Sequence, residues 1–81
     1  MELDVLFFAS YRELVGIPKV RMTLAPGATV SDLVDQVRAR GETFGRLPDR
    51  PAVAVNRTVV PHTHTLASGD EVAFLPPVAG G

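Results

Sequence analysis

The sequence predicts an α+β fold in which one long helix packs against a mixed sheet. Apolar and polar residues alternate in the first and last segments of the chain, as they do in strands. Between them, residues 30–37 carry the only long stripe with the spacing of an amphipathic helix. The resulting order is two strands, a helix and then two or three strands, which is typical of a layered α+β domain.

The first strand is predicted over residues 3–8, LDVLFF, because aromatic and β-branched side chains favour strands. Side chains along a strand alternate between its two faces. One face carries Leu3, Val5 and Phe7. The other carries Asp4, Leu6 and Phe8, which is unusually apolar for a face that meets water.

A short helix of one or two turns is predicted next, in the sequence SYRELVG. Ser10 can cap its start, Glu13 completes a capping box three residues later, and Gly16 supplies a left-handed stop. Residues 19–24 then alternate between polar and apolar side chains, as in a strand with one wet face. The first two strands can therefore form a hairpin around the short helix.

The main helix is predicted in PGATVSDLVDQVRARG. Thr29 and Asp32 suit its N-cap and third position, and Gly41 is expected to end it. Arginines near its end complement the helix dipole. Its buried stripe is Val30, Leu33, Val34 and Val37. Residues 42–51 contain glycine and prolines and are expected to form an irregular crossover.

The last third of the chain is predicted to be strands. AVAVNRTVV indicates two short strands around a tight turn at Asn56 and Arg57, although arginine suits the second turn position less well than glycine. After the SGDE turn, residues 71–75 form a final strand. Its Val72 and Phe74 lie on the face opposite Ala73 and Leu75.

Length and composition narrow the classes of function. A chain of 81 residues makes one domain with little room for a deep active site. With 46% hydrophobic and 21% charged residues, the chain is expected to fold. Its net charge is −1 and its charged residues form no blocks, so the sequence gives no basis for binding nucleic acid or an anionic membrane. The sequence shows no signal peptide and no cysteine, so we expect a cytoplasmic protein without disulfides or thiolate chemistry of its own.

Internal residues do not suggest an enzyme that works alone. His62 and His64 could begin a metal site if their segment is extended, but a solvated pair is favoured because no other histidine or cysteine is present. Asp70 and Glu71 are adjacent at a turn and are expected to be solvated. No glycine-rich phosphate loop occurs.

The segment PPVAGG, residues 76–81, is the strongest candidate for chemistry, and we call it the tail. Pro76 and Pro77 cannot continue a paired central strand and favour a stiff departure from the sheet. Extended, the tail reaches at most roughly 20 Å, enough to enter the pocket of another protein. Gly80 and Gly81 would pass through a narrow channel because they lack side chains.

The terminal carboxylate of the tail would be a poor electrophile until ATP converts it to an acyl adenylate. A sulfur donor could then leave a thiocarboxylate at Gly81. The alternative for the same residues is a flexible end or a truncated linker. The prolines that directly follow a predicted strand favour the projecting arm.

A docking surface is predicted beside the base of the tail. Phe8 and Leu75 lie on the faces opposite the expected core residues, on the first and last strands, which we expect to be neighbours at the centre of the sheet. Val59 could join them in one apolar patch. The alternative is that a loop covers Leu6 and Phe8.

Two segments, VLFFASYRELVG and SGDEVAFLPPVAGG, strongly resemble the small subunits of molybdopterin synthases. The resemblance spans essentially all 81 residues and includes the AVN turn. It implies a ubiquitin-like β-grasp domain over residues 1–75, with a mixed sheet on one main helix, and a flexible tail that includes Val78 and Ala79. Thiamine-pathway carriers share the fold and the Gly-Gly end but are shorter and lack a RELVG-like segment. Arg57 stands where many relatives have a small or amide residue, and Leu75 stands where some have phenylalanine.

The resemblance also implies a reaction sequence carried out with other proteins. An E1-like adenylyltransferase would adenylate Gly81 with ATP, and a sulfur donor protein would supply the thiocarboxylate. The tail would enter the large subunit of molybdopterin synthase, which holds the catalytic residues, and give its sulfur to cyclic pyranopterin monophosphate to build the dithiolene. Phe8, Val59 and Leu75 match the family's contact surface, and assemblies of the family are usually heterotetramers.

Three alternatives to this function stay open. The chain could carry sulfur for thiamine or tRNA thiolation, with or without ubiquitin-like conjugation to proteins. It could also be a β-grasp interaction module with an inert tail. An autonomous enzyme is the least favoured, and no permanently bound cofactor or metal is expected.

Overall fold

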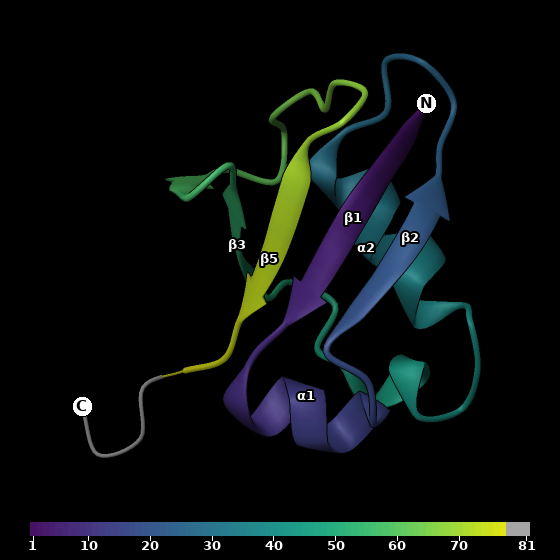
Figure 1. The fold of residues 1–81 in the computed structure, drawn as a ribbon, viewed down its shortest axis with the longest axis vertical. Coiled ribbons are helices and arrows are strands. Elements are labelled where there is room, and N and C mark those ends of the chain that lie inside the picture. Colours follow the sequence, from purple (N-terminus) through teal and green to yellow (C-terminus); the bar gives the residue numbers. More distant parts are fainter. Residues whose placement is uncertain (78–81) are drawn as a thin grey trace.

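In the computed structural model, residues 1–77 are described and form a single sheet with helices packed on and beside it (Figure 1). The sheet has five strands in the order β2-β1-β5-β3-β4. The elements along the chain are β1 (Glu2–Phe7), α1 (Ala9–Val15), β2 (Lys19–Thr23), α2 (Val30–Arg38), a 3-10 turn η1 (Phe44–Arg46), β3 (Ala52–Val55), β4 (Thr58–Val60) and β5 (Glu71–Leu75).

The sheet is mixed, as predicted. β1 pairs with β2 in antiparallel fashion and with β5 in parallel fashion, and β3 pairs antiparallel with both β5 and β4. β1 and β5, the first and last strands, are therefore neighbours at the centre of the sheet, with α2 on one face (Figure 1). The predicted hairpin of β1 and β2 around α1 is also confirmed.

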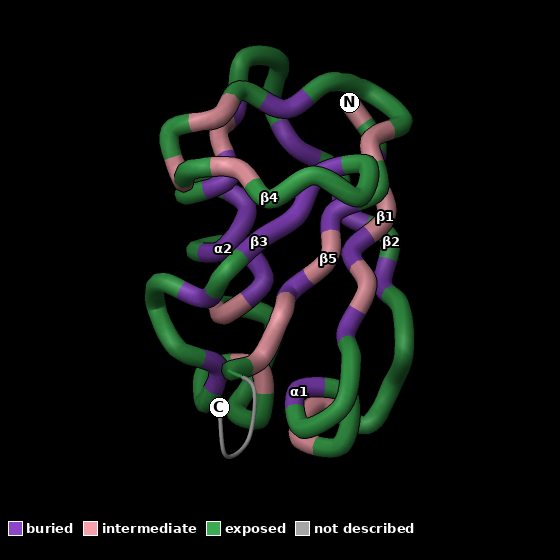
Figure 2. The backbone as a smooth tube through the Cα atoms, turned by 90° about the vertical axis from the view of Figure 1, so that its left-hand side faces the viewer, coloured by how far each residue is buried: buried purple, intermediate pink, exposed green. Residues whose placement is uncertain are grey.

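One face of the sheet packs on α2 to form the core. The predicted stripe of α2 has no exposed surface at Val30, Leu33, Val34 or Val37. Burying a valine, leucine or phenylalanine side chain stabilises a fold by roughly 1.5–3 kcal/mol. Figure 2 shows the matching alternation of buried and less buried residues along β1 and β5. On the core face the buried strand residues are Leu3, Val5, Phe7, Val20, Met22, Val53, Val55, Val72 and Phe74.

Aromatic rings fix the end of the core that lies nearest α1. Phe7 and Phe74 are register partners across β1 and β5, and their ring centroids lie 5.6 Å apart with an interplanar angle of 78°. Phe44 of η1 approaches Phe7 edge-on at 6.0 Å. Such T-shaped pairs are favourable beyond the area they bury. The strand ends from which α1 and the tail depart are thus held together.

The start of α1 corrects one prediction. The helix begins at Ala9, its N-cap residue is Phe8, and no side chain caps it. The Phe8 carbonyl oxygen instead accepts from the amides of Tyr11 at 3.0 Å and Arg12 at 3.3 Å. Because β1 ends at Phe7 and the helix follows at once, Ser10 already lies inside the first turn and cannot act as the cap. The predicted left-handed stop at Gly16 is confirmed, with φ of 83°.

The start of α2 is confirmed and its end is earlier than predicted. Thr29 and Asp32 form the capping box, with the Asp32 amide donating to Thr29 Oγ1 at 3.3 Å. The helix ends at Arg38, three residues before Gly41. Arg38 turns towards the crossover, where its Nε donates to the Leu47 carbonyl oxygen at 2.8 Å. That contact ties α2 to residues 42–51, which contain η1 and are less irregular than predicted.

Within residues 1–77, neither helix combines the length and apolarity needed to cross a bilayer.

The two helix starts give a paired test of stability. Replacing Thr29→Ala removes the side-chain cap of α2 and should lower the free energy of unfolding by about 1 kcal/mol. Ser10→Ala is the matched control, because Ser10 caps nothing and alanine favours helix interiors. Urea unfolding followed by circular dichroism measures both. An equal loss of stability in the two variants would contradict this assignment of the caps.

Candidate functional site

The face of the sheet opposite α2 carries a continuous row of apolar side chains. Strand register places Leu6 of β1 beside Ala73 of β5, Ala73 beside Ala54 of β3, and Ala54 beside Val59 of β4. The two alanines occupy the middle of the row and the larger side chains its ends. Because a methyl group rises less from the sheet than leucine or valine, this order of sizes produces a trough.

A hollow of about 540 Å³ lies over this row, and we call it the sheet hollow. Phe8 is 46% exposed and Val59 is 68% exposed, so large apolar surface faces water here. The hollow is lined by Leu6, Phe8, Ala54, Arg57, Val59, Glu71, Ala73 and Leu75.

All three predicted docking residues lie in this one hollow. Phe8, Val59 and Leu75 come from the end of β1, from β4 and from β5, and no loop of residues 1–77 buries them. The alternative of a loop covering Phe8 is therefore wrong. Sequence reasoning missed Ala54 and Ala73, which form the floor. The period-two pattern would have placed both on this face, but small side chains give no apolar signal of their own.

Charged pairs mark where the apolar region ends. On the same face, nearer the start of β1, Arg21 Nε lies 3.2 Å from Asp4 Oδ1, and Arg21 Nη1 lies 3.8 Å from Glu2 Oε2. Exposed pairs of this kind contribute little to stability. Here they keep one half of the face polar, so the apolar half is confined to the side from which the tail departs.

A hydrogen-bonded turn holds the rim of the sheet hollow. Asn56 and Arg57 form the predicted turn between β3 and β4, with φ of 49° and 72°. Asn56 Nδ2 donates to Asp70 Oδ1 at 2.9 Å, and Asn56 Oδ1 accepts from the Glu71 amide at 3.0 Å. Asp70 also accepts from the Ala67 amide at 2.8 Å. Asp70 thus has a structural role, and the turn is fastened to the start of β5.

The base of the tail lies at the end of β5, which stops at Leu75, the register partner of Ala52. Pro76 is half-buried and Pro77 is exposed. The predicted reactive end, Gly81, and the tail residues Val78, Ala79 and Gly80 lie outside the described residues.

The histidine pair does not form the extended segment considered above. His62 lies in a turn in which the His64 amide donates to the Pro61 carbonyl oxygen at 3.0 Å. His62 Nε2 is 2.6 Å from the Pro51 carbonyl oxygen, and because a carbonyl can only accept, this nitrogen carries the proton. The carbonyls of His62 and His64 accept from the first amides of α2. These residues therefore organise the start of α2, and no group of three metal-ligating side chains gathers among residues 1–77.

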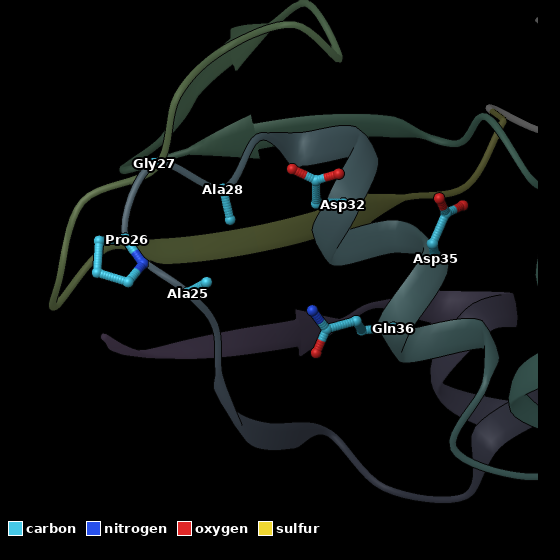
Figure 3. A pocket seen from close by; sticks show the side chains of 7 residues that line it. All are labelled: Ala25, Pro26, Gly27, Ala28, Asp32, Asp35 and Gln36. Atoms are coloured by element: carbon cyan, nitrogen blue, oxygen red, sulfur yellow. The ribbon is translucent and has the colours of Figure 1, made fainter.

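A further hollow of about 380 Å³ lies between α2 and the loop before it (Figure 3). The hollow is lined by Asp32, Asp35 and Gln36 of α2 and by the loop of residues 25–28, towards which Gln36 extends. Asp32 is already engaged in the capping box. The hollow is an open surface depression rather than a built ligand site.

Burial raises the pKa of the Tyr11 hydroxyl above its ordinary value. Its ring lies in the core at the end of the sheet from which the tail departs. The phenol therefore stays protonated near neutral pH.

Comparison with known proteins agrees with the fold and with the predicted resemblance. The sequence profile described as "ThiS family" matches residues 5–81. The chain is 43% identical to the "Molybdopterin synthase sulfur carrier subunit" of Escherichia coli K12, over 98% of this chain and 99% of that protein. It is 37% identical to "Small archaeal modifier protein 3" of Haloferax volcanii, over the full length of both.

Among solved structures, SAMP1 from Haloferax volcanii superposes with a TM-score of 0.85 at 29% identity and covers 100% of each chain. The predicted ubiquitin-like β-grasp fold is thereby confirmed, as is the resemblance to sulfur carrier subunits of molybdopterin synthase.

Two substitutions in the β3–β4 turn should change stability in opposite directions. Asn56→Ala removes the hydrogen bonds to Asp70 and Glu71 and should cost about 2 kcal/mol. Arg57→Gly relieves a left-handed backbone at a position where glycine is favoured and should gain about 1 kcal/mol. Thermal or urea unfolding measures both, and a destabilised Arg57→Gly would show that the arginine side chain stabilises the fold.

Proposed function

Because this chain belongs to the ThiS family, we propose that it is the sulfur carrier subunit of a molybdopterin synthase. The observation that carries the proposal is the 43% identity to such a subunit over nearly the whole of both chains. The apolar sheet hollow beside the base of a proline-led Gly-Gly tail supports it, because a carrier must both dock on its partners and present its reactive end to them.

The proposed chemistry takes place at the carboxylate of Gly81. An E1-like adenylyltransferase would join this carboxylate to the α-phosphate of ATP, releasing pyrophosphate. Hydrosulfide supplied by a donor protein would then attack the acyl carbon and displace AMP, leaving a thiocarboxylate. ATP is consumed by the activating enzyme and no cofactor belongs to the carrier itself.

Sulfur transfer would follow in the large subunit of molybdopterin synthase. The thiocarboxylate would deliver its sulfur there to cyclic pyranopterin monophosphate, with the large subunit supplying the catalytic residues. The tail residues from Pro76 to Gly80 would act as the arm that places Gly81 at the substrate. Holding the reacting group in place in this way replaces a bimolecular encounter with a local one.

The sheet hollow would bind the large subunit through apolar contact. Phe8 and Val59 expose large apolar surface, and burying each of them in an interface would contribute on the order of 1–2 kcal/mol. Leu75 lines the hollow and immediately precedes the tail. Docking at the hollow would therefore fix the point from which the tail enters the partner.

A second candidate function is a ubiquitin-like protein modifier. The identity to a small archaeal modifier protein and the superposition on SAMP1 favour it. Both functions begin with adenylation of the terminal glycine and differ in the acceptor, which is sulfur for the carrier and a lysine amine for the modifier. Carriers for thiamine or tRNA thiolation differ only in the protein that takes up the sulfur.

Intact-mass measurement tests the chemistry of the tail. Incubation with the activating enzyme, ATP and a sulfur source should add roughly 16 Da, because sulfur replaces one oxygen of the Gly81 carboxylate. A variant with one residue added after Gly81 is the control and should stay unchanged. An unchanged mass in the natural chain would favour the inert interaction module, and attachment to lysines of other proteins would favour the modifier.

Two substitutions test docking at the sheet hollow. Val59→Asp places a charge in the apolar surface, and Ala73→Phe fills the floor of the hollow. Each variant should weaken binding to the large subunit by about tenfold or more. Ile17→Asp is the matched control, because Ile17 is an exposed apolar residue outside the hollow. Isothermal titration calorimetry gives the affinities. If all three variants bind like the natural chain, the hollow is not the docking surface.

A further inference from the structure

A separate hollow of about 560 Å³ lies at the base of the tail, and we call it the root hollow. Its walls are largely proline, from the crossover before β3 and from the start of the tail. Tyr11 of α1 supplies one aromatic ring and Arg50 one charged side chain, and Ala52 and Leu75 complete the lining. The four prolines are Pro48, Pro51, Pro76 and Pro77.

Two residues that line the root hollow carry polar groups without partners among residues 1–77. The Arg50 side chain is exposed and makes no hydrogen bond or ion pair within this part of the chain. Tyr11 is a buried residue with no side-chain hydrogen bond in residues 1–77, and none of the fully buried polar atoms there lacks a partner. The Tyr11 hydroxyl must therefore reach solvent, where it can bond an external group.

Both groups are hydrogen-bond donors under physiological conditions. The guanidinium of Arg50 is charged and carries only N–H donors, with no acceptor atom of its own. Tyr11 keeps its proton because the ordinary pKa of a tyrosine lies well above neutral pH and burial raises it further. No carboxylate lines the root hollow, so its only charge is positive. A cation would be repelled there, and a wholly apolar ligand would leave the donors without acceptors.

A carboxylate beside an apolar side chain matches both the hydrogen-bond donors and the apolar proline walls of the root hollow. Its two oxygens can accept from the planar guanidinium and from the phenol, and charge-assisted bonds of this kind are the stronger ones. The proline walls offer flat apolar surface to the neighbouring side chain. An acidic segment of a protein provides this combination.

The root hollow adjoins the sheet hollow. Leu75 lines both of them, and Pro76 and Pro77 form one wall of the root hollow. A protein that covers the sheet hollow and takes in the tail would therefore also lie beside the lining of the root hollow, which includes Tyr11 and Arg50.

We propose that the root hollow binds an acidic segment of the protein that receives the tail, with an aspartate or glutamate of that protein accepting hydrogen bonds from Arg50 and Tyr11. The inference rests on the proposed function for the identity of this protein, the large subunit of molybdopterin synthase. It adds a polar, specificity-determining contact beside the apolar row of the sheet hollow.

Binding of the large subunit to three variants, measured by calorimetry over a range of NaCl concentrations, tests the contact. Arg50→Gln should weaken binding on the order of tenfold and flatten its dependence on salt. Tyr11→Phe keeps the buried ring and should weaken binding about threefold. Arg46→Gln is the control, because Arg46 is equally an exposed crossover arginine but pairs with Glu42 at 3.6 Å and does not line the root hollow. It should bind within about twofold of the natural chain.

Zero-length crosslinking identifies the chemical class of the ligand directly. Lys19 is the one lysine of the sequence, so Arg50→Lys introduces a single new amine, and Arg46→Lys is its control. Treatment of the complex with a carbodiimide should join position 50, and not position 46, to an aspartate or glutamate of the large subunit, located by peptide mass spectrometry.

The outcomes separate this inference from the proposed function. Unchanged binding of Arg50→Gln and Tyr11→Phe, in a chain that still binds the large subunit and carries sulfur to it, overturns the inference alone. A crosslink from position 50 to a carboxylate of this same chain also overturns it, because the root hollow would then bind its own chain. Failure of the natural chain to bind the large subunit contradicts the proposed function and the inference together.

Discussion

The parallel pairing of β1 with β5 is the constraint on which the rest of the structure depends. Pairing the two ends of the chain at the centre of the sheet sets the register of every other strand. It directs Phe7 and Phe74 into the core as a T-shaped pair and turns their sequence neighbours Phe8 and Leu75 to the opposite face. A slip of one residue would exchange these faces. The core and the proposed docking surface are thus fixed by the same backbone ladder.

The same pairing couples docking to the chemistry proposed for the tail. β5 lies between β1 and β3, so the tail leaves from the middle of the sheet rather than from a frayed edge. The sheet hollow and the root hollow meet at Leu75, its last strand residue. A partner that contacts both would fix the start of the tail, leaving only the few residues after it to be guided to the substrate. That arrangement lowers the conformational entropy lost on insertion.

Much of this could be predicted from the sequence because it depends on local periodicity. The α2 stripe, the Thr29 cap, the turn at Asn56 and the trio Phe8, Val59 and Leu75 all follow from alternation or from residue preference. Other features depend on where elements meet. Ser10 fails as a cap because the end of β1 sets the helix start. Alternation places Ala54 and Ala73 on the correct face, but only the pairing of β3 with β5 makes them one floor. The root hollow brings together residues far apart in sequence, and no local pattern reveals it.

The central claim is that the face opposite α2, together with the base of the tail, forms the surface that binds the partner. Nuclear magnetic resonance of the ¹⁵N-labelled chain, titrated with the large subunit of molybdopterin synthase, tests it most directly. The account predicts that the amide signals of Leu6, Ala73 and Val59 shift or broaden, while those of α2 stay unchanged. Changes concentrated on the exposed side of α2, with the sheet hollow unaffected, would contradict it.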